Sequence, residues 1–344
     1  MTEIIVDKSM NGSDNSYISL TEAISSLPTN ESEHITIKIA PGEYYEKIEL
    51  KRGNVTIEGM GGASEETVLF YDDCARQDMP DGSKRGTFRS YSFFIDASNI
   101  TIRNLTIENT SGSEDKAWQA IALYADGDNL KFENVRLLGH QDTLFTGPLP
   151  PKEIQPGGFI GPKQFDERIN GRHHYKNCYI RGNVDFIFGS ATALFEDCVI
   201  ESVARAFEVQ KKSPTAESGS DKADNKIIHG YVTAPSTPEG QKYGYVFKGC
   251  TFISNECPEG SVYLGRPWRD YAKAVFIDCV IGDHICAEGF HDWDKPHARD
   301  CSFFAAYGCF RQDGDAYAPT AGFAREINED ELDELTQDKI FASR

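Results

Sequence analysis

The sequence lacks features that mark several whole classes of protein. It has no apolar run long enough to span a membrane, and its first residues carry an early acidic side chain, Glu3, without the apolar stretch of a secretory signal. Basic residues are few: 35 lysines and arginines stand against 54 aspartates and glutamates, which gives a formal net charge of −19. Because phosphate binding needs a basic face, we predict neither nucleic acid nor a membrane as a partner.

Cysteine is present, but not in the pattern of a metal site or a disulfide framework. The nine cysteines are odd in number and form no Cys-x-x-Cys pair. Several follow the pattern aromatic-x-x-Cys-x-apolar, which is typical of small core residues. We therefore predict mostly reduced, buried cysteines and a cytoplasmic location, with secretion as the alternative if an export signal has been removed. The spacing of His173, His174, His284, His291 and His297 matches no standard metal site, so we predict no metal and no cofactor.

Six short segments share one design, which reads apolar, any, Asn/Asp/Gly, small or apolar, any, apolar. They are Ile102–Ile107, Phe132–Leu137, Tyr175–Ile180, Phe195–Ile200, Phe247–Phe252 and Phe276–Ile281. Their starts are roughly 20 to 50 residues apart, the range expected of solenoid coils. The Asn, Asp or Gly suits a tight bend between two short strands, and the flanking apolar residues can point inward and stack on the next coil.

This repeat predicts an all-β fold, a right-handed parallel β-helix. Residues 14–28 and 329–341 have apolar side chains at helical spacing, so we expect short helices that cap the two ends. The Pro/Gly-rich stretch at about 147–171 is expected to be a long inserted loop, because coil-like segments continue on both sides of it. We therefore predict a single domain over residues 1–344.

Polar residues interrupt apolar runs at four places. Asp185 lies within Gly182–Gly189, and an unpaired carboxylate buried there would cost several kcal/mol, so it should be paired or chemically active. Gln141 and Asp142 form a second interruption, Gln119 a third, and Arg266 a fourth. Two nearby carboxyls tend to separate their pKa values, an arginine can keep one of them ionised, and glutamine amides can stabilise an oxyanion. These residues suit metal-free ester hydrolysis, whereas the absence of a Gly-x-Ser-x-Gly element disfavours a serine hydrolase.

Five segments, in order along the chain, resemble the pectin methylesterases of carbohydrate esterase family 8. They are Gly42–Glu46, Gln119–Ala120, Gln141–Leu144, Gly182–Gly189 and Leu264–Trp268. The resemblance spans about residues 35–293. It implies a pectinesterase that removes methyl esters from galacturonate units and releases methanol through an aspartyl acyl-enzyme. The implied partner is methyl-esterified homogalacturonan or its oligosaccharides, and we expect a monomer.

The resemblance also implies a role for each catalytic residue. Asp185 matches the nucleophile, and Asp142 matches the general acid that protonates departing methanol and then activates water. Gln141 matches the residue that stabilises the oxyanion, and Gln119 an amide that assists it. Arg266 matches the arginine that keeps the nucleophile ionised.

Three further positions match residues near the substrate. Trp268 and Phe188 match aromatic residues that pack on sugar rings, and Ser92 aligns with a family threonine. One departure concerns the two aspartates, which usually lie about one coil apart in the family but are 43 residues apart here. The insertion lies between them. We expect it to fold over one end of the substrate cleft and to favour oligosaccharides or chain ends over long polymer.

Other classes of protein also use a β-helix to bind pectic polymers. A pectate lyase would need an acidic calcium cluster and a basic residue as its base, and a polygalacturonase would need carboxylates around a glycosidic bond. Neither needs Gln119 and Gln141 in the roles described. A non-catalytic carbohydrate-binding β-helix would keep the aromatic residues without requiring both aspartates. Methanol, unsaturated products or new reducing ends would distinguish these alternatives.

Overall fold

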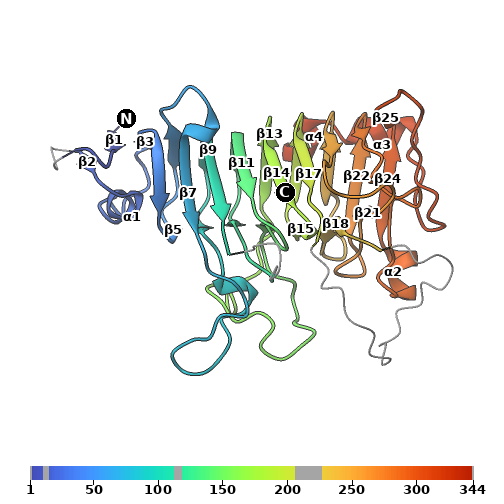
Figure 1. Ribbon diagram of the computed structural model, residues 1–344, viewed down its shortest axis with the longest axis horizontal. Coiled ribbons are helices and arrows are strands. Elements are labelled where there is room, and N and C mark those ends of the chain that lie inside the picture. Colours follow the sequence, from blue (N-terminus) through green and yellow to red (C-terminus); the bar gives the residue numbers. More distant parts are fainter. Residues whose placement is uncertain (1, 11–14, 112–117, 206–226, 343–344) are drawn as a thin grey trace.

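The chain winds into a right-handed parallel β-helix, as predicted. The structure is a computed structural model that describes residues 2–10, 15–111, 118–205 and 227–342. Figure 1 shows the coils stacked along the long axis, from the N-terminal coils in blue to the C-terminal coils in red. Each named strand pairs in parallel with its neighbours in the next coils, which forms an 18-stranded sheet and a 7-stranded sheet.

The 18-stranded sheet covers two faces of the helix, because β9 (Ile100–Asn109) and β11 (Leu130–Leu138) bend and belong to both. The first face contains β2 (Ser16–Tyr17), β1 (Thr2–Val6), β3 (Ile35–Ile39), β6 (Val55–Gly59), β13 (Arg172–Lys176), β16 (Thr192–Glu196), β19 (Tyr245–Lys248), β22 (Lys273–Ile277) and β24 (Phe303–Tyr307). The second contains β4 (Gly42–Tyr45), β7 (Thr67–Tyr71), β14 (Tyr179–Gly182), β17 (Val199–Ser202), β20 (Thr251–Ile253), β23 (Val280–Ile281) and β25 (Phe310–Arg311).

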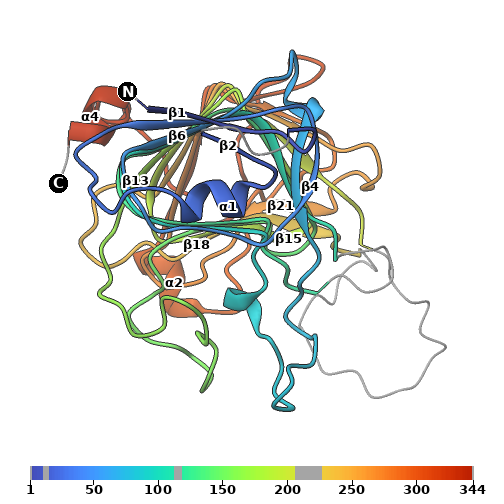
Figure 2. The same ribbon diagram turned by 90° about the vertical axis from the view of Figure 1, so that its left-hand side faces the viewer.

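The 7-stranded sheet forms the third face. Its strands, in spatial order, are β5 (Ile48–Leu50), β8 (Phe93–Asp96), β10 (Leu123–Asp126), β12 (Leu144–Thr146), β15 (Val184–Gly189), β18 (Gly230–Pro235) and β21 (Val262–Gly265). The segment 72–92, which contains the 3-10 helix η2 (Thr87–Arg89), and the insertion 147–171 both protrude on the side of this sheet (Figure 2).

The predicted bends between strands are present in all six repeated segments. Their central residues have positive φ angles: Asn104 (56°), Asn134 (53°), Asn177 (53°), Asp197 (54°), Gly249 (64°) and Asp278 (52°). Asparagine, aspartate and glycine tolerate this left-handed conformation better than other residues do. The side chain of Asn134 also donates a hydrogen bond of 2.8 Å to that of Asn104 in the preceding coil.

Two columns of like side chains fill the interior. One is a stack of rings with centroids 4.4–4.9 Å apart, formed by Phe132, Tyr175, Phe195, Phe247 and Phe276. The other is a column of buried thiols, formed by Cys178, Cys198, Cys250, Cys279 and Cys309. All nine cysteines are free, and six of them are buried. The prediction that the patterned cysteines are small core residues is therefore confirmed.

Helices close one end of the solenoid and cover one side of it. At the N-terminal end, α1 (Leu20–Ser25) lies across the opening of the first coils and buries Leu20 and Ala23 (Figure 2). The carboxylate of Glu46 accepts hydrogen bonds from the backbone N–H groups of Leu20 and Thr21. Glu46 therefore pairs with two backbone N–H groups that have no partner within the helix.

The C-terminal segment differs in detail from the expectation. It forms two short helices, α3 (Glu329–Glu334) and α4 (Gln337–Ala342), rather than one. A third helix, α2 (Pro296–Cys301), precedes β24. Ile340 packs with Leu194 and Val246, which belong to the 18-stranded sheet. The helices α3 and α4 therefore lie along the side of the β-helix, where apolar side chains on the outside of the sheet need cover.

Candidate active site

Strand register brings the predicted polar residues onto one face of the 7-stranded sheet. The backbone N–H of Ala120 donates to the Gln141 carbonyl at 3.1 Å, and that of Asp142 donates to the Val184 carbonyl at 3.1 Å. Gln119, Gln141 and the two aspartates thus come from three successive coils, and neighbouring strands are spaced about 4.8 Å apart.

The insertion does not separate the two aspartates in space. It leaves the β-helix after β12 and returns before β13, and β12 pairs directly with β15. Leu144 aligns with Ile187 across this pair, so Asp142 and Asp185 occupy equivalent positions in neighbouring coils. Although they are 43 positions apart in the sequence, the aspartates are one coil apart in the structure.

A local irregularity in β15 turns Asp185 out of the core. The register between β15 and β18 shifts between Val184 and Ile187, and Asp185 has a φ of 50°. As a result Phe186 and Ile187 both belong to the inner core, whereas Phe188 belongs to an aromatic cluster outside it. Strict alternation would place Asp185 and Phe188 on opposite faces, and the bulge allows both to lie on the outside.

Asp185 forms a two-point ion pair with Arg266, which follows β21. Nε and the Nη2 atom of Arg266 donate to the two carboxylate oxygens at 2.8 and 2.7 Å. Both side chains are largely buried, with 10% of Asp185 and 13% of Arg266 exposed. Bidentate pairing with a cation favours the ionised carboxylate and fixes its direction.

Asp142 has the opposite electrostatic environment. Its side chain is buried, and no other described residue donates a hydrogen bond to its carboxyl group. Burial raises the pKa of Asp142 well above its usual range, and the charge of Asp185 raises it further, whereas Arg266 opposes the change. The pair thus combines a carboxyl whose pKa is raised with one that is ion-paired to an arginine, the arrangement that separates an acid from a base or nucleophile.

Both aspartates lie in the left-handed region of backbone conformation, because Asp142 has a φ of 67°. Such a conformation costs about 1 kcal/mol or more for a residue with a β-carbon. Gln119 and Gln141 are half-buried, and neither side chain hydrogen-bonds to another described residue. Their amide groups therefore remain available to a ligand on this face.

The three residues predicted to lie near the substrate differ in how far they are exposed. The Phe188 side chain is 4% exposed, and its ring packs 4.9 Å from that of Phe145 and 5.7 Å from that of Trp268. Trp268 is half-buried and presents more of its surface. Ser92 is buried, and its hydroxyl lies 3.5 Å from the Tyr71 carbonyl. In this structure Phe188 supports Trp268, and the roles of these residues towards substrate stay predictions.

The insertion contributes to the same aromatic cluster. Leu149 and Phe159 are buried in it, and the Phe159 ring lies 5.8 Å from Phe88 and 6.2 Å from Trp268. Lys163 anchors the loop through an ion pair of 2.6 Å with Asp96 at the end of β8. The insertion is therefore packed beside the candidate site.

The sequence did not identify two aromatic residues that contact Arg266. The Arg266 guanidinium carbon lies 3.6 Å from the centre of the Tyr231 ring and 3.7 Å from that of Trp293. Tyr231 is on β18, and Trp293 is in the turn that precedes α2. The only sequence signal was weak, since Trp293 stands between two acidic residues, Asp292 and Asp294, in an exposed-looking stretch.

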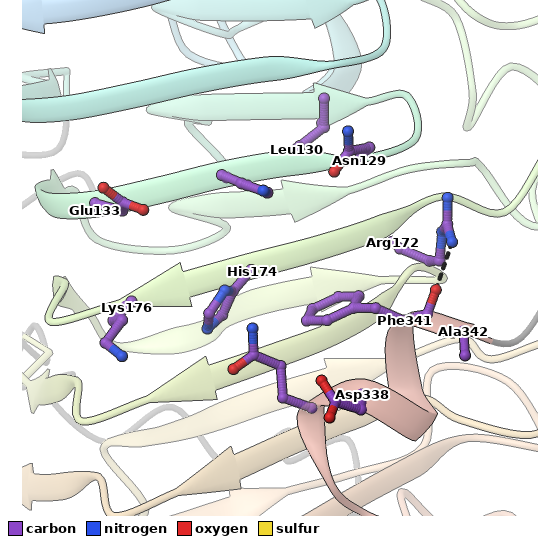
Figure 3. A pocket seen from close by; sticks show the side chains of 11 residues that line it. Asn129, Leu130, Glu133, Arg172, His174, Lys176, Asp338, Phe341 and Ala342 are labelled. Atoms are coloured by element: carbon purple, nitrogen blue, oxygen red, sulfur yellow. Dashed lines mark hydrogen bonds between the residues drawn. The ribbon is translucent and has the colours of Figure 1, made fainter.

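A hollow lies elsewhere on the molecule, between the 18-stranded sheet and α4 (Figure 3). Arg172 crosses it, with a hydrogen bond of 2.6 Å to the Phe341 carbonyl and an ion pair of 2.6 Å with Asp128. Lys176 pairs with Glu196 at 3.1 Å. Because these charges are already matched, this hollow is a poorer candidate for chemistry than the aspartate pair. Within the described ranges, no group of three or more His, Cys, Asp or Glu side chains could hold a metal ion.

The fold and the placement of polar side chains define a class: a parallel β-helical protein with a candidate hydrolytic site on its smaller sheet. Comparison with known proteins is more specific. A family model described as pectinesterase matches residues 3–148 and 168–318, and its break falls within the insertion. The chain therefore belongs to the pectinesterase family, and the enzyme class predicted from the sequence is confirmed.

Individual relatives agree with this assignment. Pectinesterase QRT1 of Arabidopsis thaliana is 32% identical over 89% of this chain and 68% of its own length. Pectinesterase 31 of the same plant is 28% identical over 92% of this chain and 85% of its own length. Among solved structures, pectin methylesterase PemA from Erwinia chrysanthemi is 26% identical, with a TM-score of 0.75 over 100% of this chain and 98% of that one. A pectin methylesterase in complex with a hexasaccharide is 27% identical, with the same TM-score and coverage.

Proposed function

We propose that this enzyme removes methyl esters from the C6 carboxyl groups of galacturonate units in pectin or pectic oligosaccharides. The family assignment supports the reaction class, and one observation carries the mechanism. Asp185 is ion-paired with Arg266, whereas Asp142, one coil away, is buried without such a partner. A nucleophile and a proton donor are thus adjacent on one face.

In the first half of the reaction, a carboxylate oxygen of Asp185 attacks the ester carbonyl carbon. The amide groups of Gln141 and Gln119 stabilise the negative charge that develops on the carbonyl oxygen. The carbon–oxygen bond to the methoxy group then breaks, and its oxygen takes the proton of Asp142. Methanol leaves, and an acyl-enzyme on Asp185 remains.

In the second half, the ionised Asp142 takes a proton from water, whose oxygen attacks the acyl carbon. The bond to Asp185 breaks, which restores the Asp185 carboxylate beside Arg266 and the proton on Asp142. The product is a galacturonic acid unit, which ionises in solution. The cycle needs no metal, and every proton is accounted for by the two aspartates.

Methanol release from methylated galacturonate oligomers tests the proposal. We expect Asp185→Asn to lower kcat about 10³-fold or more, as loss of a nucleophile does. Asp197→Asn is the matched control, because Asp197 has a similar φ of 54° but lies exposed at a bend away from the site. EDTA should leave the rate unchanged. An Asp185→Asn enzyme with the wild-type rate would refute the mechanism.

We also propose that the enzyme prefers oligosaccharides or chain ends, because the insertion packs beside Trp268 through Phe159. The hexasaccharide complex of a relative supports oligosaccharide binding in this fold.

The cellular location of the enzyme depends on the length of its substrate, since an enzyme that acts on intact polymer must meet that polymer outside the cell. The comparisons do not support the cytoplasmic location predicted from the sequence, and secretion is the alternative proposal. No helix in the described ranges could span a membrane.

The organisation of the chain is part of the proposal. Coils continue on both sides of the insertion, and the C-terminal helices pack on the outside of the same coils. We therefore propose one domain over residues 1–344 that acts as a monomer. Light scattering of the purified enzyme would test the monomer, and limited proteolysis would test the single domain.

A further inference from the structure

The guanidinium group of Arg266 is enclosed on both its edge and its faces. Its edge donates to the Asp185 carboxylate at 2.7 and 2.8 Å. Its faces meet two rings, with distances of 3.6 Å to the centre of Tyr231 and 3.7 Å to the centre of Trp293. A cation between two aromatic rings is attracted to both and is shielded from water. These contacts therefore restrain the orientation of the Arg266 guanidinium group.

The turn that carries Trp293 is strained and firmly held. Trp293 has a φ of 57°, which is uncommon for a bulky side chain, and Asp294 has a φ of 53°. The backbone N–H of Trp293 donates to Nδ1 of His291 at 2.9 Å, and that of Asp294 donates to the Asp292 carboxylate at 2.9 Å. Strained backbone persists where its surroundings determine it, and such positions cluster at functional sites.

Lys295 fastens this turn to the strand end that bears Arg266. Its Nζ donates to the carbonyls of Pro267 and Trp268 at 2.8 and 3.2 Å. The same Nζ lies 4.2 Å from the centre of the Trp293 ring. The ring of Trp293 is thus held at a fixed place relative to Arg266 by bonds from its own turn.

We propose that Trp293 is a positioning residue that acts through Arg266. Together with Tyr231 it keeps the guanidinium in the plane of the Asp185 carboxylate, so that the carboxylate stays aimed at the ester carbon. The inference rests on the proposed function and adds a residue to it. Trp293 is not one of the reacting groups and acts only through its contact with Arg266. A misplacement of about 1 Å in such a group can lower a rate about 100-fold.

The test compares Trp293→Leu with Trp293→Phe in methanol-release assays on a methylated trimer. We expect Trp293→Leu to lower kcat roughly 10- to 100-fold with little change in KM. Trp293→Phe, which keeps a ring, should restore most of the rate. Among the described residues, the other titratable groups that interact electrostatically with Arg266 or Asp185 are Asp142, Arg205 and Lys295. All are unchanged in these variants.

A double-variant measurement separates positioning from a general structural role. In an Arg266→Lys background, the planar fork is absent, so Trp293→Leu should have little further effect on kcat. Equal effects of Trp293→Leu in both backgrounds would overturn the inference, as would a rise in KM with kcat unchanged, which is expected of a sugar-binding ring. Circular dichroism confirms that each variant is folded. Failure here leaves the proposed reaction intact if Asp185→Asn is inactive, and an active Asp185→Asn refutes the reaction independently.

Discussion

At the scale of single residues, the central contrast is between two aspartates with the same backbone conformation and opposite electrostatic surroundings. Asp185 is paired at both carboxylate oxygens with Arg266. Asp142 is buried and lies near the negative charge of Asp185. Both have positive φ angles, 50° and 67°. The strain and the burial are unfavourable for stability, and their coincidence at one place is expected of a site selected for chemistry.

The raised pKa of Asp142 leads to a prediction about alkaline pH. Because the general acid must be protonated, kcat should fall as pH rises through the raised pKa of Asp142. Asp142→Asn should lose about 10²- to 10⁴-fold in kcat, and its residual rate should show no basic limb. The measurement is kcat for methanol release from a methylated trimer between pH 4 and 9.

Asp126 provides the control for this experiment. It is also a buried aspartate, and burial raises its pKa to about 7, but it lies at the end of β10 beneath Gly147. Asp126→Asn should keep the basic limb. If the limb disappears in Asp126→Asn and persists in Asp142→Asn, the assignment of the general acid is wrong.

The sequence identified Asp185, Asp142 and Arg266 because each is a polar residue within an apolar or strand-like run. The structure brings these three together, although their roles in the reaction are still to be tested. The sequence could not identify Trp293, because its contact with Arg266 depends on a left-handed turn held by long-range bonds from Lys295. It did not show how deeply Phe188 is buried, because the Phe145 and Trp268 rings that cover it come from other coils.

At the scale of elements, the sequence repeat predicted the coils and their bends but did not predict the bulge in β15. A bend needs only one residue that tolerates a positive φ, such as Asn104 or Asp278, so it is visible in a short pattern. The bulge depends on how β15 pairs with β18, where the register shifts after Val184. Pairing of this kind is set by three-dimensional neighbours that a single strand does not specify.

The insertion allows a prediction about substrate length. Phe159→Ser should release the insertion from Phe88 and Trp268 and open one end of the cleft. We expect the ratio of kcat/KM for methylated polymer, per site, to that for a methylated trimer to rise about tenfold, the value of roughly 1.4 kcal/mol of altered transition-state binding. Methanol release on both substrates measures the ratio.

Phe165→Ser is the matched control, because Phe165 belongs to the same loop but is 90% exposed. It should leave the ratio unchanged. The idea fails if the wild-type enzyme already de-esterifies polymer as fast per site as the trimer. It also fails if Phe159→Ser remains folded and leaves the ratio where it was.

At the scale of the whole molecule, charge and substrate chemistry act in the same direction. The net charge is −19, whereas a methyl ester is neutral and its hydrolysis leaves a carboxylate. An acidic molecule repels an anionic product more than a neutral substrate. The negative charge from which we predicted no nucleic-acid partner is therefore compatible with a pectinesterase, in which Arg266 supplies a local cation at the site itself.

The interior also determines how the molecule responds to acid. His173 is fully buried, and burial lowers the pKa of its imidazole to about 4. His284 is 4% exposed, and burial lowers its pKa to about 4 as well. The unfolded chain binds protons at these histidines near pH 6.5, and the folded chain does so only near pH 4. Stability should therefore fall as pH decreases through this window.

We expect the free energy of unfolding to fall by about 1–2 kcal/mol per buried histidine between pH 7 and pH 5. Urea denaturation at the two pH values measures the change. The double variant His173→Asn/His284→Asn should lose most of this dependence, even if it is less stable at pH 7. His297→Gln is the control, because the His297 side chain is 69% exposed, and it should keep the wild-type dependence. An unchanged dependence in the double variant would contradict the prediction.

The effect bears on function, since each ester hydrolysed releases a proton when the product ionises. The reaction thus moves its own medium towards the pH at which the fold weakens.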